Sequence, residues 1–196
     1  IIVLDKPSSR DLILQLQAGS LEALGELYDR YQALVYRTAL VITNDSNAAE
    51  DLLQDVFLRL HRFADRIDPQ RPLEPWLYRM TANLSYTWVK RSRRWYRPLE
   101  DLAEWLVGGE KNSPQEQIEQ DDDWEQVQRA VSSLPLQQRV VVVLYYLNDL
   151  SLQEISDILD VPVGTVKSRL HYGRMALKLK LGLDNDILPD LNHERP

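Results

Sequence analysis

SLQEISDILDVPVGTVKSRL, residues 151–170, contains two short helical patterns separated by a turn, and this stretch decides the fold class. Ser151 is followed three residues later by Glu154, a spacing that predicts a capping box at the start of the first helix. Residues 160–162 interrupt the pattern, and apolar residues recur at helical spacing again from Val163. We therefore predict a helix-turn-helix.

The second helix of this pair, residues 163–181, carries five Lys or Arg residues and no Asp or Glu. Projection on a helical wheel places Val166, Leu170, Gly173 and Leu177 on one buried side. The opposite side presents Ser168, His171, Tyr172 and Met175, flanked by Lys167, Arg169, Arg174 and Lys178. Hydrogen-bonding side chains flanked by cations are what a major-groove recognition helix needs, so the pattern favours DNA binding. A packed helical hairpin with a solvated basic face is the alternative.

The predicted fold class is all-α, because apolar residues recur at helical spacing along nearly the whole chain and glycine is scarce. Ser8 or Ser9 can cap the first helix, which is expected to end at Gln17. Further helices are expected from residue 21 onward and at about 48–64, 76–95, 124–133, 136–147, 151–159 and 163–181.

The net charge of −7 is distributed unevenly along the chain. Residues 1–99 carry a charge of +2, residues 100–126 a charge of −9, and residues 127–196 a charge of 0. The acidic segment also contains Gly, Asn, Ser and Pro, which is typical of a solvated linker. We therefore predict two small helical domains joined by an acidic flexible linker. The expected boundaries are 1–98 for the first domain, 99–125 for the linker, 126–182 for the second domain and 183–196 for a C-terminal tail.

The predicted helix at 76–95 has a basic face with an aromatic and an amide side chain among the cations. Cations can follow phosphates while a ring stacks on an unpaired base, so this face is suited to single-stranded or melted DNA. A solvated helix surface is the alternative, although the neighbouring polar loop supports the first interpretation. The face contains Arg79, Asn83, Tyr86, Lys90 and Arg93, and the loop contains Arg66, Asp68, Gln70 and Arg71.

The predicted helix at 48–64 carries a leucine on its solvent side. Leu58 falls almost opposite the apolar stripe and is surrounded on the wheel by Asp51, Gln54 and Asp55. An apolar anchor within an acidic face could contact a basic partner helix, and a single exposed leucine without function is the alternative.

Several classes of protein are disfavoured. Cysteine is absent, which excludes disulfides and thiolate metal sites, and the three histidines are scattered. No phosphate-binding loop, metal-ligand cluster or nucleophile–base pair is apparent, so we expect no catalytic residues, cofactor or metal. No apolar stretch approaches the roughly 20 residues of a membrane helix, and residues 1–10 do not form a signal segment. A cytoplasmic protein without membrane insertion is expected.

Four stretches together resemble the extracytoplasmic-function sigma factors of bacterial RNA polymerase, in the order found in that family. They are residues 11–31 (DLILQLQAGSLEALGELYDRY), 48–63 (AAEDLLQDVFLRLHRF), 75–94 (PWLYRMTANLSYTWVKRSRR) and 134–177, which include the helix-turn-helix. The resemblance implies a promoter-melting domain (region 2), a linker, and a domain that reads the −35 element (region 4). It also implies core polymerase, through its β′ clamp helices and β flap, promoter DNA and an anti-sigma factor as partners.

The resemblance assigns roles to the candidate residues. It implies that Asp51, Gln54, Asp55 and Leu58 bind the β′ clamp helices. The loop with Arg66, Asp68, Gln70 and Arg71 would capture a flipped −10 base, and Arg79, Asn83, Tyr86, Lys90 and Arg93 would contact the −10 region. Thr165, Lys167, Ser168, Arg169, His171, Tyr172 and Lys178 would serve the −35 element. Tyr172 stands where the family frequently has Arg, so base preference is not transferable. A free-standing helix-turn-helix regulator is the alternative function.

Overall fold

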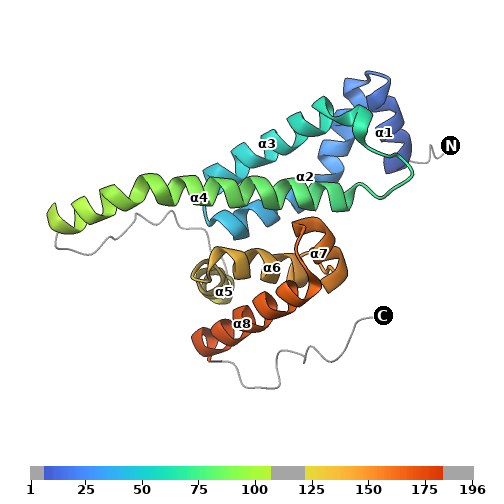
Figure 1. Cartoon of the computed structure of the whole chain (residues 1–196). Helices are drawn as coiled ribbons and strands as arrows, with labels where there is room; N and C mark the ends of the chain where they lie inside the picture. Colours follow the sequence, from blue (N-terminus) through green and yellow to red (C-terminus); the bar gives the residue numbers. More distant parts are fainter. Residues whose placement is uncertain (1–6, 107–121, 183–196) are drawn as a thin grey trace.

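The computed structural model describes residues 7–106 and 122–182, except the side chains of residues 93–106 and 122–125. The described residues form helices and contain no strand, which confirms the all-α prediction (Figure 1). The helices are α1 (Ser9–Gln17), α2 (Leu21–Thr43), α3 (Ser46–Arg62), the 3₁₀ turn η1 (Ala64–Arg66), α4 (Glu74–Leu106), α5 (Asp122–Ser132), α6 (Leu136–Tyr146), α7 (Leu152–Leu159) and α8 (Val163–Leu181).

Helices α1 to α4 form the first unit, in which α2 packs against α1, α3 and α4. Its core contains Leu12, Leu27, Val56, Leu60 and Leu77, each fully buried. Side-chain caps begin α1, α2 and α3, because an N-terminal turn leaves backbone N–H groups without partners within the helix. Ser8 and Asp11 form a capping box at α1, and Asp45 accepts the N–H of Ala48 at α3.

Helices α5 to α8 form the second unit and include the predicted helix-turn-helix, made of α7 and α8. The capping box of Ser151 and Glu154 is present at α7, as the sequence predicted. Helix α8 packs closely on α6 at Gly173, where a Cβ atom would lie 2.7 Å from a methyl carbon of Val142. Only glycine permits this approach without a shift of α6 or of its side chains.

The two units pack against each other, with α6 and α7 lying alongside α2 and α4 (Figure 1). One apolar cluster spans the contact and combines Ile42 and Tyr78 of the first unit with the core of α5 to α8. Two side chains of the second unit donate hydrogen bonds across it. The Arg139 guanidinium binds the Ile42 carbonyl oxygen (2.7 Å), and the Asn148 amide binds Thr38 Oγ1 (2.9 Å).

Helix α4 differs from its prediction at the C-terminal end. It continues to Leu106, whereas the sequence predicted an end near Trp95 and a linker from residue 99. The sequence prediction placed the loss of apolar periodicity at Pro98. The residues after it keep leucine at helical spacing between acidic residues, a pattern that favours helix. Residues 107–121 of the expected linker, and the tail 183–196, lie outside the described residues.

Candidate nucleic-acid and polymerase interfaces

Helix α8 presents the predicted −35 residues on its exposed side. Val166, Leu170, Gly173 and Leu177 are buried as predicted, which fixes the rotation of the helix. The side chains of Lys167, Ser168, His171 and Tyr172 are exposed, while those of Thr165, Arg169 and Lys178 are half-buried. The rings of His171 and Tyr172 meet edge to face, with centroids 5.5 Å apart. One expectation was wrong, because Arg174 is 7% exposed and belongs to the core side of the helix instead of its basic flank.

Helix α4 presents most of the predicted basic and aromatic face. Arg79, Asn83 and Lys90 are exposed and Tyr86 is half-buried, whereas the side chain of Arg93 lies outside the described residues. The Lys90 ammonium lies 4.7 Å from the centroid of the Tyr86 ring, a cation–π contact. A hydrogen bond from Gln137 and the neighbouring Lys90 lower the pKa of the Tyr86 hydroxyl.

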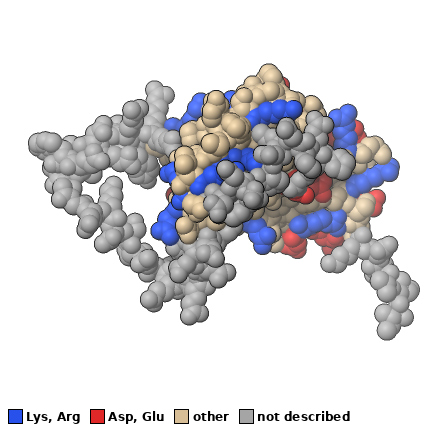
Figure 2. All heavy atoms as spheres, turned by 90° about the horizontal axis from the view of Figure 1, so that it is seen from below, with Lys and Arg blue, Asp and Glu red and all other residues tan. Residues whose placement is uncertain are grey.

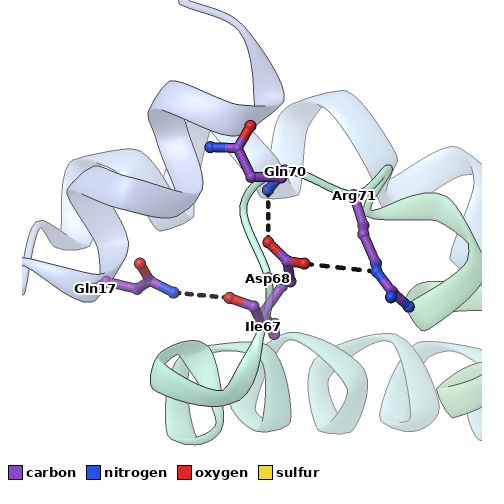
Figure 3. A network of polar contacts seen from close by, with 5 residues as sticks. All are labelled: Gln17, Ile67, Asp68, Gln70 and Arg71. Atoms are coloured by element: carbon purple, nitrogen blue, oxygen red, sulfur yellow. Dashed lines mark hydrogen bonds and ion pairs between the residues drawn. The ribbon is translucent and has the colours of Figure 1, made fainter.

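The segment from the end of η1 to α4 exposes the four polar residues predicted to capture a base, and Figure 3 shows three of them, Asp68, Gln70 and Arg71. Asp68 organises the loop, because its carboxylate accepts the backbone N–H of Gln70 (2.9 Å) and lies 3.5 Å from Arg71 Nε. Arg66 stacks its guanidinium over the Phe63 ring, at 5.3 Å from the centroid. The loop therefore has internal order while its side chains remain accessible.

The candidate DNA-binding residues of the two units face one another across the contact between the units. A hollow of about 560 Å³ is lined by Tyr86 and Lys90 of α4 and by the start and exposed face of α8, including Thr165, Ser168, Arg169 and Tyr172. A second hollow of about 700 Å³ lies between the η1–α4 loop and α7. Figure 2 views the side of the second unit, where Lys and Arg side chains are spread over much of the described surface.

Arg79 joins the two units directly. Its Nε donates to the Ile158 carbonyl oxygen (3.1 Å) and its Nη2 to the Asp157 carbonyl oxygen (2.8 Å), both at the C-terminal end of α7. A cation is favourable there, because the last turn of a helix has carbonyl groups without helical partners. A residue predicted to contact DNA is thus engaged by the other unit.

A second buried stripe on α4 was missed by the sequence interpretation. Tyr78, Ala82 and Val89 are at most 8% exposed and pack in the cluster shared with the second unit. Their helical spacing was the available signal. On the helical wheel these three residues lie between the stripe predicted for the core, which contains the fully buried Leu77, and the basic face, which contains Asn83.

The acidic face of α3 is exposed as predicted. Leu58 is 65% exposed, and Asp51, Gln54 and Asp55 around it are also exposed. The opposite side of the same helix is buried, with Leu52 and Leu53 at 5% and 8% exposure. An accessible apolar side chain lies here among acidic neighbours.

Two features are absent from the described residues, 7–106 and 122–182. Within these ranges, no three His, Cys, Asp or Glu residues are grouped so that they could hold a metal ion. No helix within them combines the length and apolar character needed to cross a membrane.

Comparisons with known proteins match each of the two helical units to a family model. Residues 27–95 match the family Sigma-70 region 2, and residues 124–177 match Sigma-70, region 4. The chain is 31% identical over 176 residues to the ECF RNA polymerase sigma factor SigW of Bacillus subtilis (strain 168), covering 86% of this chain and 94% of the relative.

Among solved structures, CnrH in complex with the cytosolic domain of CnrY aligns with 90% of this chain and 99% of the CnrH chain, with a TM-score of 0.65 and 24% identity. The sigma factor RpoE in complex with the anti-sigma factor NepR from Bartonella quintana aligns with 82% of the chain and 98% of its own, with a TM-score of 0.64 and 21% identity. Both structures share the fold.

Proposed function

The chain belongs to the ECF sigma factors of RNA polymerase, and from this premise we propose how its two helical units divide promoter recognition. It is a transcription initiation factor, which brings core polymerase to promoters. The first unit, residues 1–98, would act as region 2 and recognise and melt the −10 element. The second unit, residues 126–182, would act as region 4 and recognise the −35 element, with residues 99–125 as the acidic linker.

The exposed side of α8 is suited to reading the −35 element in the major groove. Ser168, His171 and Tyr172 occupy the centre of that side, and the buried residues opposite them hold the helix in this rotation. Lys178, further along the helix, would reach the DNA backbone, since a recognition helix places its N-terminal part against base edges.

The face of α4 and the η1–α4 loop are suited to the −10 element. Lys90 and Arg93 would hold phosphates of the opening strand, and the Tyr86 ring supplies a surface for an unpaired base. Asp68 and Arg71, exposed in an ordered loop, would contact the captured base.

The two elements cannot both be bound in the arrangement described above. Positions −10 and −35 are about 25 base pairs apart, or roughly 85 Å at about 3.4 Å per base pair. In the structure, the corresponding faces of α4 and α8 line one hollow, and Arg79 bonds directly to α7. We therefore assign the structure to a closed form, from which the units separate when the protein joins polymerase on a promoter.

The exposed acidic face of α3 would bind the β′ clamp helices through Leu58 and its neighbours, and the second unit would contact the β flap. Two fold neighbours are structures of complexes, one with the cytosolic domain of CnrY and one with the anti-sigma factor NepR. By analogy, an anti-sigma factor that holds the closed form would restrain this protein. We place the action of this chain in the cytoplasm with the polymerase, and assign the chain no catalysis of its own.

A free-standing helix-turn-helix regulator is the alternative function, and it is not favoured because it accounts for neither the region 2 match nor the Leu58 face.

The observation that carries this proposal is the pairing of an exposed recognition face on α8 with an exposed basic and aromatic face on α4. Run-off transcription with core polymerase tests it on templates in which the −10 and −35 elements are changed separately. Dependence on both elements is the expected result. Specific initiation that is insensitive to the −35 sequence, or tight duplex binding without polymerase, would contradict it.

A further inference from the structure

Helix α1 lies outside residues 27–95, the part of the chain matched to region 2, yet it contacts the loop proposed to read the −10 element. The contact is made by Gln17, its last residue, whose side chain is half-buried. The amide nitrogen of Gln17 donates to the carbonyl oxygens of Ala64 (3.0 Å) and Ile67 (2.9 Å). These acceptors are 47 and 50 residues further along the chain, and Figure 3 shows Gln17 approaching the base of the loop at Ile67.

The two acceptors mark the point at which the loop leaves the core. Ala64 begins η1, and Ile67 follows its last residue with an extended backbone and a buried side chain. The Ile67 carbonyl belongs to the peptide that leads into Asp68, the residue whose carboxylate binds the N–H of Gln70 and pairs with Arg71. The orientation of this peptide therefore sets the direction in which the exposed part of the loop starts.

The other connections of the loop are independent of Gln17. The Ala64 oxygen also accepts the N–H of Ile67 (3.0 Å), so the 3₁₀ turn keeps a hydrogen bond of its own. At the far end, Leu73 is 2% exposed and the Tyr31 hydroxyl donates to the Glu74 carboxylate (2.8 Å). Without the Gln17 amide, both ends of the loop would stay anchored. Only the peptide between Ile67 and Asp68, which orients Asp68, would lose a hydrogen bond from the core.

We propose that Gln17 is a positioning residue for −10 recognition, which orients the base-reading loop through its two hydrogen bonds without touching DNA. This inference rests on the proposed role of the loop and adds α1 to the parts of the chain that determine promoter choice. A side chain discriminates between bases only when its position is fixed, and hydrogen bonds from neighbouring residues help to fix it.

The test compares two substitutions that differ in donor capacity. Gln17→Met keeps the length of the side chain and removes its donors, whereas Gln17→Lys keeps a group able to donate to both carbonyl oxygens. Gln15 is exposed on the same helix, so Gln15→Met and Gln15→Lys are the matched controls. Each variant of the chain is combined with core polymerase, and run-off transcription is measured on templates with every base at each −10 position. Thermal melting is measured in parallel.

We expect Gln17→Met to reduce the ratio between the best and worst −10 templates by roughly threefold to tenfold, the range that corresponds to a lost hydrogen bond. Gln17→Lys should retain most of the ratio, and both Gln15 variants should match the unmodified protein. A Gln17→Met ratio equal to that of Gln15→Met would overturn the proposal. So would a uniform loss of activity on all templates that follows the loss of folded protein.

The loop itself supplies the separate control. Asp68→Ala and Arg71→Ala should change −10 preference if the loop reads the base. If neither does, the proposed role of the loop fails. If they change it and Gln17→Met does not, the loop reads DNA and only the role of Gln17 is refuted.

Discussion

Replacement of Leu58 by alanine should weaken binding to core polymerase without loss of the fold. The side chain is 65% exposed on α3, so its truncation removes few intramolecular contacts. We expect the free energy of unfolding to change by less than about 0.5 kcal/mol. Full burial of a leucine contributes about 1.5–3 kcal/mol, and the part still exposed here corresponds to roughly 1–2 kcal/mol at an interface that covers it. The dissociation constant should therefore rise about fivefold to thirtyfold.

A neighbouring leucine provides the control. Leu53 is on the same helix but only 8% exposed, so Leu53→Ala creates a cavity and should cost about 2–5 kcal/mol of unfolding free energy. Urea unfolding followed by circular dichroism measures stability, and fluorescence titration of labelled protein with core polymerase measures affinity. Addition of Gln54→Ala to Leu58→Ala should weaken binding further at little cost in stability.

Two results would refute this reasoning. If Leu58→Ala destabilised the protein as much as Leu53→Ala, the side chain would be part of a core that the structure does not show. If polymerase affinity stayed within twofold of the unmodified protein, the acidic face of α3 would not be the polymerase contact.

The remaining predictions concern DNA and the closed form. Lys90→Ala should reduce opening of the −10 region on all promoters alike, seen by permanganate reactivity of unpaired thymines, because phosphate contacts carry no base information. Ser168→Ala or His171→Ala should change the ranking of −35 variants, at about 1–3 kcal/mol per lost base contact, and a common scaling of all promoters would contradict the placement of α8. Lys178→Ala should instead weaken all promoters and lower the salt slope by about 1. Arg79→Gln should shift the free protein toward separated units, by about fivefold in the open-to-closed ratio, as measured by energy transfer between labels on α3 and α8.

Local signals were sufficient to predict most of the helices. Helix α8 begins and ends at the predicted residues, 163 and 181, and its buried stripe was read correctly from spacing alone. The capping box at Ser151 and the exposed position of Leu58 were also predictable, because each depends on residues within one or two helical turns.

The contact between the two units could not be predicted in the same way. Its polar part consists largely of arginine side chains that bind backbone carbonyl oxygens, as with Arg79 at Ile158 and Arg139 at Ile42. Every residue has a backbone carbonyl group, so the sequence does not indicate which carbonyl oxygen will accept such a hydrogen bond. Its apolar part required a second buried stripe on α4, and a helix buried on two sides gives a weaker amphipathic pattern than a helix buried on one.

The contact of Arg79 with α7 and its proposed contact with DNA respond differently to ionic strength. In the structure the guanidinium binds two neutral carbonyl oxygens, an interaction that releases no condensed counterions. Contacts of the same cation with DNA phosphates do release them, so the affinity of each such contact falls with salt at a logarithmic slope of about −0.9. A rise in salt should therefore weaken the proposed promoter-bound state while leaving the contact with α7 nearly unchanged. The proposed exchange of Arg79 between α7 and DNA would make the fraction of promoter-bound protein sensitive to ionic strength, before any regulatory protein is bound.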